Sequence, residues 1–302
     1  MKKSLKLFTL LFAVVFGLAA CSQDDDMDGE GTVSLSITDA PIDEAGVSAV
    51  FVTITGIEYQ MSGGSWEAFE EFEGPVTINL LDLQNGASEL LGDFNAGAGT
   101  YTGLRFLLDA AVQNQNEISN PGCYITFEEA EDQPLFVPSG GQSGYKAIGD
   151  FTVPVNGTVG ITADFDLRKS VTKAGASGKY LLNPTIRVIV NDQAGEIQGQ
   201  IENRVEGATY IVYAYEAGTY TEEEAAAPAE GENRFPNAVT STSVDAEGNY
   251  VLAFLAPTEY EIVVVEVTAE GENVVKEQES GVKVSSNTSL ELNFSLDLGL
   301  LD

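Results

Sequence analysis

Short runs of alternating apolar and polar residues, separated by turn-forming residues, constrain this chain more than any other feature. In residues 32–38, Val33, Leu35 and Ile37 occupy every second position. Because successive side chains of a strand point to opposite faces, this run predicts a half-buried β-strand. Residues 47–61 predict a second strand, with Val50, Val52 and Ile54 on one face. Further strands are expected at 66–69, 76–83, 100–109, 123–128, 133–137, 158–168 and 180–190.

This pattern predicts an all-β protein with two antiparallel β-sandwich or barrel domains in tandem. The chain has 302 residues, which is enough for two domains with separate cores. The first domain is expected at 31–191 and the second at 192–302, and a helical turn is expected only near 86–92. The acidic loop 219–236 is expected to be a mobile hairpin insertion.

The first twenty residues predict a signal peptide. Three lysines precede an apolar stretch that is too short to span a bilayer. The sequence Leu-Ala-Ala-Cys at 18–21 resembles the lipobox of bacterial lipoproteins. This resemblance implies that the chain is cut after residue 20 and that Cys21 carries a lipid, which would make a membrane its first partner.

The acidic segment 21–30 is expected to be a solvated tether, because it has no apolar content to bury. It also resembles the export signal of lipoproteins from Bacteroidota. That resemblance implies a location in the outer membrane, facing the cell exterior, and the periplasmic face is the alternative.

The composition excludes several classes of function. The formal net charge is −33, with 14 Lys and Arg against 47 Asp and Glu, so nucleic acid is not expected as a partner. The acidity favours solubility, or else cation association. No histidine is present, which removes Ser-His-Asp and Cys-His catalysis and His-based zinc sites. We therefore predict no enzyme activity, no cofactor and no metal site, and we expect Cys123 to be a buried, inert thiol.

Six motifs occur in order through the first domain. They are Thr-Asp-Ala-Pro (38–41), Asn-Leu-Leu-Asp-Leu (79–83), Gly-Thr-Tyr-Thr-Gly-Leu-Arg-Phe (99–106), Pro-Ser-Gly-Gly-Gln-Ser-Gly-Tyr-Lys (138–146), Asp-Phe-Asp-Leu-Arg-Lys-Ser (164–170) and Gly-Lys-Tyr-Leu-Leu-Asn-Pro-Thr-Ile-Arg-Val (178–188). Together they resemble the DUF4382 family of exported bacterial and archaeal proteins. The resemblance covers the whole first domain and implies its boundaries, but it implies no activity.

The motif at 164–170 contains one candidate binding group. Asp164, Asp166 and Arg168 are expected on one face of a strand, where two carboxylates two residues apart can share a cation or hold a polar ligand. The alternative is cross-strand ion pairing with Arg105 or Arg187 on a solvated face.

The second domain has its own set of motifs, at 195–201, 207–215, 243–252 and 255–262. They resemble the carboxypeptidase regulatory-like domain, which implies a small, non-catalytic, seven-stranded prealbumin-type sandwich. Thr258 and Glu259 fill a turn where that family usually has glycine.

Strand parity singles out Tyr213 and Tyr215. If Ala208, Tyr210 and Val212 face the core, these two tyrosines face outward as a row that can stack on sugar rings. The alternative is that they are covered by a neighbouring strand, by the acidic loop or by the first domain.

We therefore expect a lipid-anchored binding or interaction protein with a glycan or a protein as its ligand. One alternative is carbohydrate binding through the second domain. A carboxylate-based glycosidase needs two acids in one cleft, which no motif indicates. A structural or adhesive surface protein would have no small-molecule pocket.

Overall fold

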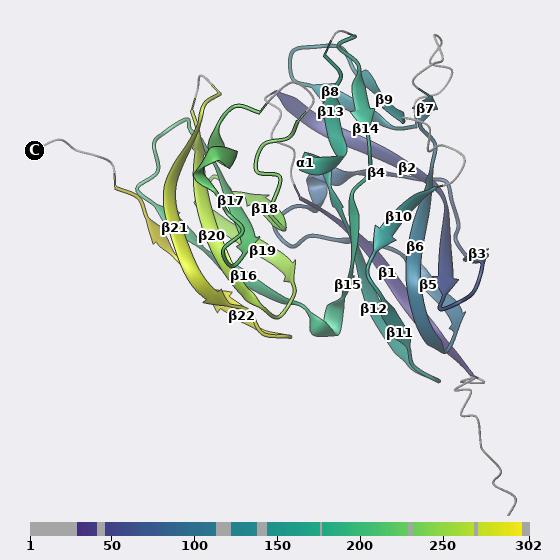
Figure 1. The fold of residues 1–302 in the computed structure, drawn as a ribbon. Coiled ribbons are helices and arrows are strands. Elements are labelled where there is room, and N and C mark those ends of the chain that lie inside the picture. The colour runs from purple at the N-terminus through teal and green to yellow at the C-terminus, as the bar shows by residue number, and fades with distance from the viewer. Residues whose placement is uncertain are drawn as a thin grey trace, which may run out of the picture.

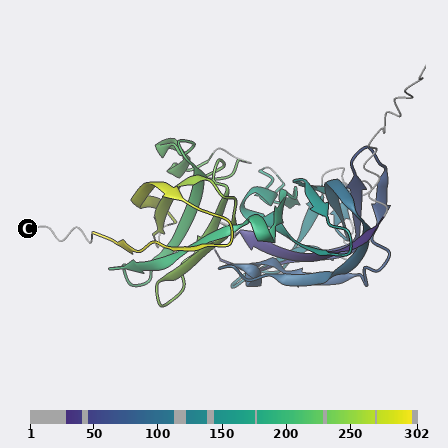
Figure 2. The ribbon, with the colours of Figure 1, turned by 90° about the horizontal axis from the view of Figure 1, so that it is seen from below.

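The computed structural model describes residues 29–40, 46–112, 122–137, 144–175, 177–228, 232–268 and 271–297. These residues form almost only β-strands, which confirms the all-β class (Figure 1). The strands up to residue 190 form one sheet and those from residue 195 form two others. The 3-10 turn η2 (Asn191–Gln193) lies between the two sets. Figure 2 shows the domains side by side, with the chain entering the first domain at the end away from the second.

The first domain is a curved sheet of fifteen strands. They are β1 (Glu30–Ala40), β2 (Val47–Met61), β3 (Trp66–Ala68), β4 (Val76–Asn79), β5 (Glu89–Gly97), β6 (Gly99–Leu108), β7 (Ala111–Val112), β8 (Tyr124–Phe127), β9 (Gln133–Val137), β10 (Tyr145–Ile148), β11 (Phe151–Val153), β12 (Thr158–Asp166), β13 (Val171–Lys173), β14 (Tyr180–Leu182) and β15 (Ile186–Val190). Most pairs are antiparallel. Strand β1 is the exception that matters for the site, because it runs parallel to β12 and places the ends of both strands at one edge.

The alternation of the sequence accounts for the core of this domain. Val33, Leu35 and Ile37 of β1 are fully buried. The face of β2 that was expected to be apolar, which includes Val50 and Val52, is fully buried as well. These residues belong to a single cluster that continues through β6 and β12.

The second domain is a sandwich of two four-stranded sheets. One sheet contains β16 (Gly195–Glu202), β19 (Asn249–Leu255), β22 (Ser289–Glu291) and β23 (Phe294–Ser295). The other contains β17 (Thr209–Glu216), β18 (Thr240–Ser243), β20 (Glu259–Val267) and β21 (Asn273–Lys283). Tyr210 and Val212 of β17 lie in the core between the sheets and Ala208 packs against it, as the parity argument assumed, and Ala214 is buried there as well.

The helical turns do not lie where the sequence predicted them. The prediction at 86–92 is wrong, because β5 begins at Glu89 and pairs with β1, burying Phe94. The 3-10 turn η1 (Leu80–Leu83) forms instead, and the side chain of Asn79 caps it. A second turn, α1 (Leu167–Ser170), ends β12 early, because the side chain of Asp166 accepts a hydrogen bond from the Lys169 N–H at 3.2 Å.

Some predictions fall on residues that the structure does not describe. The signal peptide, Cys21 and nearly all of the tether lie outside the described residues, as do residues 138–143 of the fourth motif. Within the described ranges, no helix has the length and apolarity needed to cross a bilayer.

Candidate functional site

The three charged candidates of the first domain lie together at the junction with the second domain. Asp164, Asp166 and Arg168 are at most 5% exposed, so they are not on a solvated face as one expectation held. They are buried by a contact between the domains. Strand β12 ends at the edge of the first domain, and the Arg168 side chain of α1 contacts the loop that leads into β18 of the second domain. Hydrophobic alternation reports which face of a strand is apolar, and it cannot report that a second domain covers the polar face.

Arg168 is the central contact between the domains. Its guanidinium donates hydrogen bonds to the carbonyl oxygens of Phe235 and Ala238, the latter at 3.2 Å. It also pairs with the Asp166 carboxylate at 2.8 Å and lies 5.6 Å from the Tyr213 ring centroid. The ammonium of Lys169 donates to the same Ala238 carbonyl at 2.6 Å, and burial lowers the pKa of Lys169. Two cations of the first domain thus satisfy backbone acceptors of the second.

Asp164 and Asp39 form the acidic part of the junction. Arg187 donates to Asp164 at 2.7 Å, so the predicted cross-strand pair with Arg187 forms, whereas Arg105 pairs with Glu58. Burial raises the pKa of Asp164, and the Arg187 cation opposes this shift. Burial, reinforced by the charge of Asp164, holds the pKa of Asp39 well above its usual value.

A loop of the first domain also contacts the second through the exposed residue Asn85. Asn85 adopts a left-handed backbone conformation at φ 55°. Its side-chain oxygen accepts hydrogen bonds from the Thr242 hydroxyl at 2.8 Å and from the Val251 N–H at 3.1 Å. Its amide donates to the Ser243 carbonyl at 3.1 Å. Asn85 therefore links β18 and β19, which belong to different sheets of the second domain.

The expectation that Tyr213 and Tyr215 are exposed is wrong. Both are fully buried in a second cluster on the outer face of β17. Residues of the acidic loop cover them: the Phe235 ring lies 4.2 Å from that of Tyr213, and Glu224 accepts a hydrogen bond from the Tyr215 hydroxyl at 3.2 Å. The alternative of cover by the loop and the first domain describes their position, so they are not a sugar-stacking row. Tyr220, Ala225 and Phe235 of this loop pack on the sheet.

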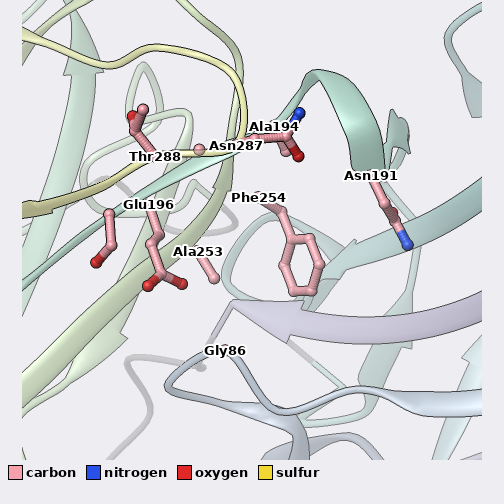
Figure 3. Close-up of a pocket in the computed structure, with 10 residues that line it drawn as sticks. Gly86, Asn191, Ala194, Glu196, Ala253, Phe254, Asn287 and Thr288 are labelled. Atoms are coloured by element: carbon pink, nitrogen blue, oxygen red, sulfur yellow. The ribbon is translucent and has the colours of Figure 1, made fainter.

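A cleft between the domains lies beside this junction (Figure 3). It has a volume of about 330 Å³ on the side of Glu196 and Thr288, and a further cavity of about 190 Å³ lies on the side of Asp150 and Arg187. The Phe254 ring borders both and points into the space between Ala194 and the loop with Gly86.

Phe254 was not a candidate from the sequence, and a break in strand periodicity explains why. Tyr250 and Leu252 face the core, so strict alternation would turn Phe254 inward. A register shift between β16 and β19 turns Leu255 inward instead. Phe254 is left half-exposed, in the left-handed conformation at φ 55°. That conformation is costly for a bulky residue, by about 1–2 kcal/mol, and such strain concentrates at functional sites.

The remaining cysteine behaves as expected. Cys123 is fully buried and free, and burial raises its pKa to about 12. Among the residues with a described position, no three of the types His, Cys, Asp and Glu are grouped so that they could hold a metal ion.

The fold and the junction together define a class: an all-β protein whose two domains are docked through a buried, charged interface. Within that class, the chain belongs to the DUF4382 family. Residues 30–184, about half of the chain, match the model of this family, whose description is "Domain of unknown function (DUF4382)".

Solved structures give only distant similarities. The Bacillus anthracis TIE protein is 11% identical at a TM-score of 0.22, over 88% of this chain and 34% of that one. The minor pilin GBS52 of Streptococcus agalactiae is 9% identical at a TM-score of 0.21, and the match covers 89% of this chain and 95% of the pilin. The gamma-CGTase of alkalophilic Bacillus clarkii is 12% identical at a TM-score of 0.26, and the match covers 80% of this chain and 34% of that enzyme. The chain thus spans about a third of the TIE protein. No curated protein matches its sequence.

Proposed function

We propose that this protein is a lipid-anchored, non-enzymatic binding protein of the cell envelope that holds a small saccharide in the cleft beside Phe254. The observation that carries the proposal is the half-exposed Phe254 ring, held in a strained backbone conformation at the border of both cavities. An aromatic face provides apolar contact for a sugar ring, and convergent polar groups fix its orientation. Glu196, Thr288 and Asn191 supply such groups around the larger cavity.

The size and chemistry of the cleft favour binding over the alternatives. A volume of about 330 Å³ lies within the range of small-ligand sites. A purely structural or adhesive protein would not need such a cleft. A carboxylate-based glycosidase needs two acids at a defined separation, whereas Glu196 and Asp150 each line a different cavity.

The finer assignments from the sequence belong to this proposal. The lipobox at 18–21 supports lipidation of Cys21, and the acidic segment after it supports display on the outer face of a Bacteroidota-type outer membrane. The two four-stranded sheets of residues 195–295 support the resemblance to the carboxypeptidase regulatory-like domain.

A glycan array probed with the full chain tests the function. Phe254→Asn removes the ring and retains a residue that tolerates the left-handed conformation, so we expect binding to be lost while the protein stays folded. Trp66→Ala is the control, because it removes another half-exposed aromatic from the first domain. The proposal fails if no glycan binds, or if Phe254→Asn binds as well as the unmodified chain.

A further inference from the structure

A third, smaller cavity lies inside the domain junction and shares Gly86, Ala253 and Phe254 with the wall of the saccharide cleft. Both domains contribute polar residues to its wall: Thr38, Asp39 and Asp164 from the first, and Thr240, Ser241 and Thr242 from the second. The volume open to the centre of a water molecule is about 10 Å³, which corresponds to a single water or ion.

Three polar atoms of these residues have no hydrogen-bond partner within the part of the chain that the structure describes. They are Oδ2 of Asp39, Oδ1 of Asp164 and Oγ of Ser241, and all three are fully buried. The residues themselves are 6%, 2% and 4% exposed. Buried polar atoms in proteins are nearly always paired, so three unpaired oxygens around one cavity indicate that something binds between them. The Ser241 hydroxyl is a second, uncharged group at this cavity, and it belongs to the second domain whereas both acids belong to the first.

The charges around the cavity indicate that the bound species is positive. Asp166 is matched by Arg168 and Lys169. One carboxylate oxygen of Asp164 pairs with Arg187, and the other has no hydrogen-bond partner among the described residues. Asp39 forms no ion pair with the described residues, and its carboxylate accepts a hydrogen bond from the Leu167 N–H at 3.2 Å. An uncompensated carboxylate at this depth is strongly unfavourable.

We propose that Asp39, Asp164 and Ser241 bind one dehydrated hard cation, of the size shared by Ca²⁺ and Na⁺, between the two domains. Carboxylate and hydroxyl oxygens are ligands of hard cations. Mg²⁺ is disfavoured, because it releases its waters reluctantly and the cavity has room for only one particle. Since the ligands come from both domains, the ion stabilises their docking. The three proposed ligands do not line the saccharide cleft, so the ion site does not rest on the proposed saccharide binding.

The test measures thermal unfolding and equilibrium dialysis of the full chain in CaCl₂ or NaCl, with choline chloride keeping the ionic strength constant. We expect the midpoint to rise by roughly 3 °C at an ion concentration ten times the dissociation constant. A response to Ca²⁺ at constant Na⁺ assigns calcium, and a response to Na⁺ without Ca²⁺ assigns sodium. No response to either ion overturns the proposal.

Variants separate this site from nonspecific binding to the acidic surface. Asp39→Asn removes the charge, and its amide can donate to Asp164, so we expect the ion response and one bound ion per chain to be lost. Asp93→Asn is the matched control, since it makes the same charge change at an exposed position of β5 and should keep both. Ser241→Ala should weaken binding at least tenfold without a charge change, and it decides the matter if Asp39→Asn does not fold. An unchanged ion response in Ser241→Ala and in any folded Asp39→Asn overturns the proposal.

Discussion

Truncation of Arg168 is the most direct perturbation of the junction. In Arg168→Ala, the Phe235 carbonyl loses its guanidinium partner and keeps the hydrogen bond from the Ala238 N–H, while the Ala238 carbonyl and Asp166 each retain Lys169. A hydrogen bond from a charged donor contributes about 1.5–3 kcal/mol, and the loss of one partner of a buried ion pair costs about 3–5 kcal/mol. Because Lys169 compensates part of this, we expect a loss of about 3–4 kcal/mol in the free energy of unfolding.

Differential scanning calorimetry of the full chain measures this loss. For a protein of this size, it corresponds to a fall in the unfolding midpoint of roughly 6–16 °C. Weaker docking should also resolve two transitions, one for each domain. Lys283→Ala is the control, because its ion pair with Glu259 is exposed and contributes less than about 1 kcal/mol. A loss below about 1 kcal/mol in Arg168→Ala would refute the assignment of this residue as the central contact.

Three further predictions concern individual side chains. Asn85→Gly keeps the left-handed conformation but loses the side-chain hydrogen bonds, and should lower stability by about 1–2 kcal/mol in urea unfolding; an unchanged midpoint would contradict its linking role. Cys123 should resist iodoacetamide at pH 8 until the protein is unfolded, since burial raises its pKa to about 12 and thiolate is the reactive form; native labelling by mass spectrometry would show otherwise. Burial raises the pKa of Tyr101 and of Tyr145 to about 12, so the unfolded chain releases these protons first. The free energy of unfolding should therefore fall as the pH rises from 10 to 12. Urea unfolding across this range measures it, and a free energy that does not change with pH would contradict the prediction.

The fold was predictable where burial follows the two-residue period of a strand. Val33, Leu35 and Ile37 identify β1 and its buried face, and Tyr210 and Val212 identify the inner face of β17. Breaks in this period were not predictable, because they depend on pairing partners. The β5 strand is defined by its pairing with β1, and its Gly-containing sequence has only a weak pattern of its own.

The candidate residues were found, but not the site that they form. Asp164, Asp166, Arg168 and Tyr213 were selected for different reasons on two domains, and docking brings them to one junction. Their burial follows from contacts between segments about seventy residues apart, which local patterns do not encode. Phe254 escaped notice because its exposure results from a register shift.

Strand β1 also has a mechanical consequence. Its eleven residues extend for roughly 35 Å, from the entry of the chain to the junction with the second domain. If a lipid holds the chain at Cys21, a pull on the second domain loads β1 along its length. The hydrogen bonds to the parallel β12 and the antiparallel β5 then bear the force in shear, so that many must break together. Strand β1 therefore positions Asp39 and would also carry the mechanical load between the membrane anchor and the second domain.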